Sequence, residues 1–209
     1  QYCSKKIRKC NKRMISSNKM HLIDSSLQRL LAYLVSTSFQ GFDPYDTLNS
    51  PINFKVFGKW GPPIAIQIQK RNPVNIRGVI GVKKGYNPKG MGLFLKAYSL
   101  LYQKTGNKAY LENADWLFNW LRQNYSIGYS GYCWGYNFDW ANPEGYLPAY
   151  TPSVVVTSFV IDGVFNYYLA TGNHQAIEII HSAANYITKD IPITELPTGI
   201  SFAYTHLSK

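Results

Sequence analysis

A repeated tripeptide constrains the fold of this 209-residue chain more than any other feature. Thr105-Gly106-Asn107 and Thr171-Gly172-Asn173 lie 66 positions apart, and each follows a segment with apolar residues at helical spacing. Each unit therefore reads as a helix, a tight turn built on glycine, and a returning helix. Such a hairpin cannot bury its apolar face alone and must stack on similar copies. The same offset relates three further pairs: Tyr102 and Tyr168, Leu111 and Ile177, Glu112 and Glu178.

The pattern predicts an all-α protein built from helical hairpins. Helices are expected over 24–39 and 63–71, and two longer ones are expected to begin at Asn87-Pro88 and Thr151-Pro152. Residues 24–71 could be a degenerate first hairpin, and 199–206 look extended. The expected buried faces are Met91, Leu95, Tyr98 and Leu101; Leu111, Ala114, Leu117, Phe118 and Leu121; Phe159, Val160, Val164 and Tyr167; and Ile177, Ile180, Ala184 and Ile187.

Long loops separate the hairpins, whereas the turns within the hairpins are short. The loops over 40–62 and 126–150 are therefore expected to gather at one end of the assembly. They concentrate the aromatic residues, which make up 15% of the chain. Loops of this length inside a compact domain are usually functional or disordered, and their aromatic content favours ordered, functional loops.

The net charge is +11, and its uneven distribution along the sequence indicates a basic tail, 1–20, and a helical-hairpin domain, 21–209. The tail contributes +7 and contains no acidic residue. It could bind phosphates on nucleic acid or anionic lipid, or it could be a solvated terminus. Because the tail lacks interleaved aromatics and the rest has no nucleic-acid motif, a specific nucleic-acid partner is not expected. Membrane contact through the tail stays an alternative.

The sequence lacks the motifs that are typical of several classes of protein. Three scattered cysteines form no disulfide framework, and no Cys/His spacing suggests zinc. No glycine-rich phosphate loop is present, and no apolar run approaches the ~18 residues of a membrane span. No cofactor or metal is therefore expected. The basic N-terminus has no apolar stretch behind it, so we expect a cytoplasmic protein without a secretory signal.

Helical hairpins with a small-Gly-Asn turn and long aromatic loops resemble the six-hairpin (α/α) toroids of carbohydrate-active enzymes. That superfamily contains glycoside hydrolases, polysaccharide lyases and sugar epimerases. A full toroid needs six hairpins, and this chain supplies about three. The resemblance therefore implies a partial toroid, a fragment of a larger one, or a ring completed by another chain.

Three sequence segments give a narrower resemblance. They are GFDPYDTLNSP at 41–51, NIR at 75–77 and CWGYNFDW at 133–140. Together they are similar to an uncharacterised bacterial family found with polysaccharide-biosynthesis genes. The resemblance covers roughly residues 40–190 and implies carbohydrate as the partner molecule.

Asp43, Asp46 and Asp139 are the candidate catalytic residues. Two carboxylates that flank a glycosidic bond can act as general acid and as base or nucleophile. Asp43 and Asp46 lie on one loop, and Asp139 lies on another loop expected at the same end. The alternative is structural, because aspartates in such turns cap backbone amides.

Aromatic and polar loop residues are the candidate substrate contacts. Trp134, Tyr136 and Trp140 alternate with small or polar residues and, if exposed, could stack on sugar faces. The same alternation could equally be a short half-buried strand that faces the core. Tyr45 is a weaker member of the group. Further candidates are Asn49, which could hydrogen-bond hydroxyls, and Arg77, which could hold a sugar carboxylate or phosphate or pair with Asp43 or Asp46.

Two functions remain open from the sequence. The first is acid/base processing of a polysaccharide or its precursor, with hydrolase, lyase and epimerase chemistry not separated. The second is a non-catalytic helical scaffold that binds glycan or a partner enzyme. The spacing of the loop carboxylates across a common cleft distinguishes a glycosidase from the scaffold.

Overall fold

The computed structural model describes residues 20–143 and 145–207, so the predicted basic tail lies almost wholly outside the described residues. Two compact units divide the chain, Gln1–Gln40 and Gly41–Lys209. In the first unit a helix covers 20–36, which confirms the helix expected there. It ends three residues before the predicted end at 39, because Ser38 and Phe39 both adopt positive φ.

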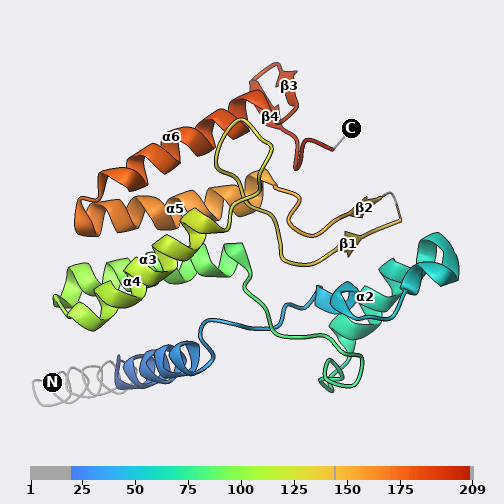
Figure 1. Ribbon diagram of the computed structural model, residues 1–209, viewed down its shortest axis with the longest axis horizontal. Helices are drawn as coiled ribbons and strands as arrows, with labels where there is room; N and C mark the ends of the chain where they lie inside the picture. Colours follow the sequence, from blue (N-terminus) through green and yellow to red (C-terminus); the bar gives the residue numbers. More distant parts are fainter. Residues whose placement is uncertain (1–19, 144, 208–209) are drawn as a thin grey trace, which may run out of the picture. The chain divides into compact units, whose positions relative to one another are not determined.

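Two helical hairpins dominate the second unit and confirm the all-α hairpin fold (Figure 1). The first pairs α3 (Pro88–Thr105) with α4 (Lys108–Gln123), and the second pairs α5 (Val154–Thr171) with α6 (His174–Lys189). Gly106 and Gly172 end α3 and α5 in the left-handed region, at φ 68° and 69°. The asparagines that follow cap α4 and α6 through their side chains. Closure of the hairpins into a ring stays a prediction.

Helices α3 and α5 pack against each other along two glycines. A Cβ at Gly163 would lie 2.2 Å from the carbonyl oxygen of Gly92, and a Cβ at Gly92 would lie 2.8 Å from Cα of Val160. The backbones therefore touch without intervening side chains. Around this crossing, Met91, Leu95, Val160 and Val164 are fully buried. This close contact fixes the two hairpins relative to each other.

We expect Gly163→Ala to destabilise the second unit by about 2–3 kcal/mol, because the added methyl must push two backbones apart. Urea unfolding measures the change. Gly90→Ala is the matched control, since a Cβ there meets only ordinary contacts at 3.8 and 3.9 Å. The control should stabilise α3 by about 0.5–1 kcal/mol. Equal effects of the two substitutions would contradict the packing argument.

Helix α5 is apolar on nearly all sides. Of the described helices, only α5 is long and apolar enough to cross a bilayer, judged by length and composition. The core helix of a globular protein passes the same test, and α5 packs against α3 on one side and α6 on another. These contacts account for its buried residues, whereas Phe159, Phe165 and Leu169 remain exposed on its other side.

Three details of the sequence-based prediction are wrong: the start of α5, the buried face of α6, and the burial of Phe159, which is exposed. The cap of α5 is Ser153, whose Oγ accepts a hydrogen bond from Val156 N, because Pro152 lies in extended backbone paired with Gly135. The buried face of α6 is rotated by one residue from the prediction. The residues that it buries are Ala176, Ile179, Ala183 and Tyr186, whereas Ile177, Ile180 and Ile187 are half-buried and Ala184 is exposed.

Short helices and strands form within and beside the loops. The first loop folds into η1 (Asp46–Asn49), η2 (Phe54–Trp60) and α2 (Gly61–Arg71), the last of which confirms the short predicted helix. Two hairpins pair β1 (Trp140–Ala141) with β2 (Tyr146–Leu147) and β3 (Ile193–Leu196) with β4 (Gly199–Phe202). A bridge between Gly41 and Gly85 holds the first loop beside the start of α3. The degenerate hairpin over 24–71 crosses the boundary between units and stays a prediction.

Candidate functional site

A cavity of about 610 Å³ lies where the loops meet the N-terminal end of α3. It brings together four of the predicted site residues: Asp43, Tyr45, Tyr136 and Trp140. These come from loops about 90 residues apart in sequence, as expected if the loops gather at one end. The remaining lining residues are Pro44, Asn87, Lys89, Gly90, Leu93, Phe138, Leu147 and Tyr204.

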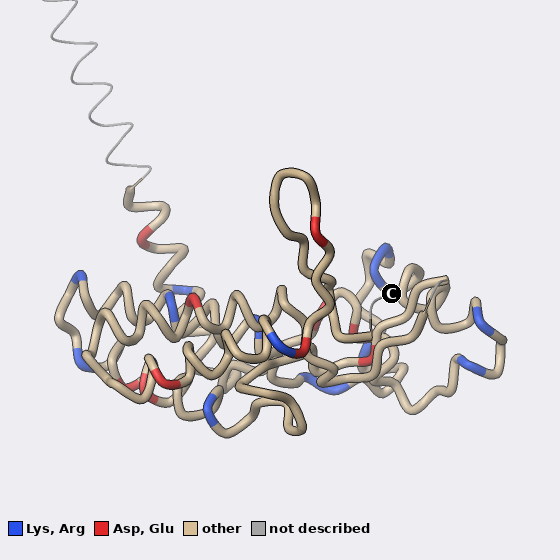
Figure 2. Tube along the Cα trace, turned by 90° about the horizontal axis from the view of Figure 1, so that it is seen from above, with Lys and Arg blue, Asp and Glu red and all other residues tan. Residues whose placement is uncertain are grey.

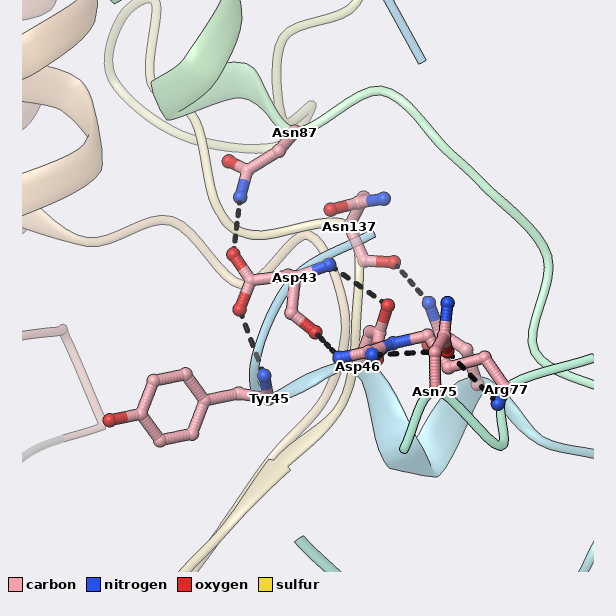
Figure 3. A network of polar contacts seen from close by, with 8 residues as sticks. Asp43, Tyr45, Asp46, Asn75, Arg77, Asn87 and Asn137 are labelled. Carbon is pink, nitrogen blue, oxygen red and sulfur yellow. Dashed lines mark hydrogen bonds and ion pairs between the residues drawn. The ribbon is translucent and has the colours of Figure 1, made fainter. Parts of the chain in front are cut away.

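Asp43 provides the one carboxyl group among the described residues of this cavity (Figure 3). One carboxyl oxygen accepts a hydrogen bond from Tyr45 N at 3.0 Å, and the other accepts from the Asn87 side-chain amide at 3.0 Å. Asn87 in turn caps α3 by accepting from Lys89 N. The helix start thus orients Asn87, and Asn87 orients the carboxyl group of Asp43.

Burial raises the pKa of Asp43 above the ordinary value of 3.8, and the neighbouring Asp46 charge raises it further. The hydrogen bonds from Tyr45 N and Asn87 and the charge of Arg77 oppose this rise without cancelling it. A carboxyl group with a raised pKa exchanges a proton more readily near neutral pH. Such a group is suited to general acid or base chemistry.

Two tyrosines extend the polar surface of the cavity. Tyr136 and Tyr204 hydrogen-bond to each other through their side chains, and Tyr204 also bonds Ser153. Burial raises the pKa of both phenols, and the Asp43 charge adds to the rise at Tyr136. Both phenols are therefore neutral at physiological pH. They can donate hydrogen bonds to a ligand but do not act as ready bases.

Asp46 and Arg77 form a buried ion pair behind the cavity (Figure 3). Nε of Arg77 lies 2.8 Å from Oδ1 of Asp46, and the side chains are 14% and 5% exposed. Arg77 also donates to the backbone oxygen of Asp43, and Asp46 accepts from the backbone N–H of Asp43. The pair therefore holds the Asp43 loop from both sides. This arrangement is the internal ion pair that the sequence left open for Arg77.

The other predicted site residues lie outside the cavity lining. Asp139 accepts hydrogen bonds from the Tyr146 hydroxyl and from Ala149 N, which brace the β1–β2 hairpin. Asn49 donates to the backbone oxygen of Asn137. Trp134 is 1% exposed, and its indole N–H donates to the Leu121 carbonyl, so it packs in the core and offers no face to a sugar. Catalysis by Asp139 stays an untested prediction.

Sequence reasoning missed Lys89, Asn87 and Tyr204 as cavity residues. Asn87 was predicted only as a helix cap, and it serves as one while also holding Asp43. Tyr204 follows β4, far along the chain, and nothing in its local sequence connects it to Asp43. The amide N–H of Val154 bonds the backbone oxygen of Tyr204, which brings this segment to the start of α5.

Two further hollows adjoin the loops. One of about 670 Å³ shares Tyr45 and Trp140 with the Asp43 cavity and adds Lys70 and Arg71. The larger, about 780 Å³, is lined by aromatic rings and amides, among them Tyr86, Trp120 and Gln123. Neither contains a described carboxylate. Figure 2 shows basic and acidic positions interspersed along the described trace. Of the residues that line the Asp43 cavity, Asp43 and Lys89 are the charged ones.

The sulfur and metal chemistry of the described residues is limited. No three His, Cys, Asp or Glu side chains within 20–143 and 145–207 come together as a metal site requires. Burial, and then the Asp190 charge, raises the pKa of the Cys133 thiol to about 12. Cys133 is fully buried and stays protonated. It is a packed core residue.

The raised pKa of Asp43 predicts how stability depends on pH. The folded chain keeps this proton to higher pH than the unfolded chain, so Asp43 makes the free energy of unfolding fall as pH rises from about 3.8 through the folded pKa. Urea unfolding between pH 3.5 and 7 isolates this contribution as the free energy of unfolding of the native chain minus that of Asp43→Asn, which should decrease over the interval. An increase in that difference would contradict the direction of the shift.

Comparison with known proteins identifies no family. No protein-family model matches the chain, and no curated protein matches it. Among solved structures, the crystal structure of a sugar epimerase from a ruminal bacterium is similar, with a TM-score of 0.44 and 20% identity. The match covers 60% of this chain and 32% of that one, so the chain spans about a third of that protein's length. Any functional conclusion therefore depends on the cavity itself.

Proposed function

We propose that the protein processes carbohydrate in the Asp43 cavity, with Asp43 as the acid/base group. The observation that carries this proposal is a half-buried carboxyl group of raised pKa in a cavity with aromatic walls and neutral phenols. Aromatic faces bind the apolar faces of sugar rings, and hydroxyl groups of Tyr136 and Tyr204 can bond sugar hydroxyls. Lys89 supplies a cation at the same cavity.

A single carboxyl group favours one class of reaction. Hydrolysis of a glycosidic bond by the common mechanism needs two carboxylates across the bond, and the described lining contains one. Proton removal from, or return to, a sugar carbon needs one acid/base group and neighbouring donors. We therefore favour lyase or epimerase chemistry. Asp46 would act as a positioning residue, because Arg77 already neutralises it.

Non-catalytic glycan binding is the second candidate function. The hollow lined by Tyr86, Trp120 and Gln123 favours it, because aromatic rings with amide side chains suit neutral sugars, and the described lining supplies no carboxylate. A scaffold with this surface could present glycan to a partner enzyme. Completion of the helical ring by another chain belongs to the same proposal.

One experiment separates these functions. The full chain is incubated in D2O with a panel of neutral and anionic oligosaccharides, and products are followed by proton NMR. New reducing ends indicate hydrolysis, unsaturated sugars indicate elimination, and deuterium at a sugar carbon without cleavage indicates epimerisation. Binding without turnover across the panel would reject the enzymatic function and support the non-catalytic, glycan-binding function. Absence of binding would reject both.

A further inference from the structure

A hollow of different chemistry lies between η2, α2 and residues 76–80. Its volume is about 310 Å³, and it shares no lining residue with the Asp43 cavity. Phe57 and Trp60 supply aromatic walls from η2, and Ile64 and Ile68 supply aliphatic walls from α2. These four side chains are between 50% and 72% exposed. The second unit therefore leaves an apolar hollow open to solvent at this place.

Two polar side chains of this hollow have no hydrogen-bond partner among the residues that the structure describes. Gln69 is 4% exposed, and neither its amide nitrogen nor its amide oxygen is bonded. Thr47 is 2% exposed, and its hydroxyl oxygen is also unpaired. Both residues line the hollow. Buried amides nearly always have partners, because leaving donor and acceptor unpaired away from water is unfavourable.

We propose that this hollow binds a small neutral molecule with an apolar body and one group, an amide or hydroxyl, that both donates and accepts hydrogen bonds. Gln69 recognises that group, because its carboxamide offers one donor end and one acceptor end. The apolar body packs between Phe57, Trp60 and the isoleucines. This site is independent of the proposed carbohydrate chemistry.

The lining sets the charge and the size of the ligand. Within 20–143 and 145–207, no Asp, Glu, Lys, Arg or His lines the hollow, so a charged head group would lose its hydration without gaining a counter-ion. The volume lies at the lower end of the range for small-molecule sites, which favours a molecule of about ten heavy atoms. A purely apolar occupant would leave Gln69 and Thr47 unpaired. This argues against an apolar surface of a second copy of this chain as the occupant.

The test uses 3-phenylpropanamide as the probe and 3-phenylpropanoate as its charged analogue of the same size. Each is titrated into the full chain, and the side-chain amide resonances of Gln69 are followed by ¹H–¹⁵N NMR. Gln69→Leu removes the polar group while keeping the bulk of the side chain. Gln67→Leu is the matched control, since Gln67 is on the same helix, is exposed, and lies outside this hollow.

The amide probe should shift the Gln69 side-chain resonances and bind about tenfold more weakly to Gln69→Leu. It should bind Gln67→Leu as it binds the native chain. The carboxylate should bind the native chain at least about tenfold more weakly than the amide. Gln69→Leu should also unfold at a higher denaturant concentration than the native chain, because the substitution removes an unpaired buried amide.

Three results would overturn the proposal. The first is an unchanged Gln69 resonance at saturating amide probe, which needs no variant and so holds even if Gln69→Leu fails to fold. The second is equal affinity of Gln69→Leu and the native chain for the amide. The third is a concentration-dependent dimer, measured by sedimentation, that Ile68→Lys dissociates, because a second copy would then occupy the hollow.

Discussion

Asp43→Asn is expected to lower turnover by about 10²–10⁴-fold on whichever oligosaccharide the native protein processes. Asparagine keeps the shape of the side chain and one oxygen, but it neither gives nor takes a proton at the reacting position. Binding should change far less than turnover, because Tyr45, Tyr136 and Trp140 still line the cavity. Rates and dissociation constants measured on the same oligosaccharide separate the two effects.

A paired variant distinguishes a catalytic Asp43 from a structural one. In Asp43→Asn the new amide group can face the Asn87 side chain, which already donates to position 43 and must keep its oxygen for Lys89 N. The double variant Asp43→Asn/Asn87→Asp restores a donor–acceptor pair and keeps the α3 cap. Stability should recover while turnover stays low, because the carboxyl group now stands on the wrong residue.

Two results would reject a catalytic role for Asp43. If Asp43→Asn turns over substrate at the native rate, the acid/base role fails. Asp139→Asn then becomes the informative variant, since the sequence placed Asp139 in the same role. If the double variant recovers turnover together with stability, the effect of Asp43 is structural.

Arg77→Met is expected to destabilise the second unit by about 3–5 kcal/mol. The substitution removes the partner of Asp46 and leaves a 5%-exposed carboxylate without a counter-charge. It also removes the bond to the backbone oxygen of Asp43, so the loop that carries the cavity carboxyl loses its support. Urea unfolding at pH 7 measures the loss.

The chain offers a matched ion pair as the control. Lys96 and Asp162 pair at the same 2.8 Å, but their side chains are 38% and 45% exposed. Lys96→Met should therefore cost only about 0–1 kcal/mol. The double variant Asp46→Asn/Arg77→Met should recover much of the stability lost in Arg77→Met, since no buried charge remains. A loss in Arg77→Met no larger than that in Lys96→Met would contradict this account.

The hairpins could be predicted because their determinants are local. Gly106 and Gly172 end helices in a conformation that favours glycine, and the next asparagine caps the next helix whatever lies around it. The buried face of α4 was likewise predicted from spacing, since its Ala114, Leu117 and Leu121 stripe has a polar opposite side.

The buried face of α6 could not be predicted from spacing alone. Two adjacent apolar stripes run along this helix, one through Ala176 and Ala183 and the other through Ile177 and Ile180. The buried stripe carries two small alanines and ends at Tyr186, which packs in a cluster with Cys133 and Ile191. The contacts of the folded chain bury the stripe with fewer isoleucines, so the hydrophobicity of the two stripes does not identify the buried face.

The candidate site divides in the same way. The sequence supplied the chemical types: carboxylates, an arginine and alternating aromatics on loops between hairpins. Tertiary contacts assigned their surroundings: Asp43 at a cavity, Asp46 against Arg77, and Trp134 in the core. Burial and hydrogen bonding set the pKa of a carboxyl group, and neither can be read from the neighbouring residues in the chain.

The sequence by itself thus determined the helices, their glycine turns and the gathering of the long loops at one end, because these follow from backbone preferences and short-range spacing. Only the tertiary structure decided which carboxyl group faces open space and which is neutralised. It also placed Tyr204 beside Tyr136 and left Gln69 unpaired in an apolar hollow. Those outcomes depend on contacts between segments far apart in the chain, where solvent exclusion and charge pairing act.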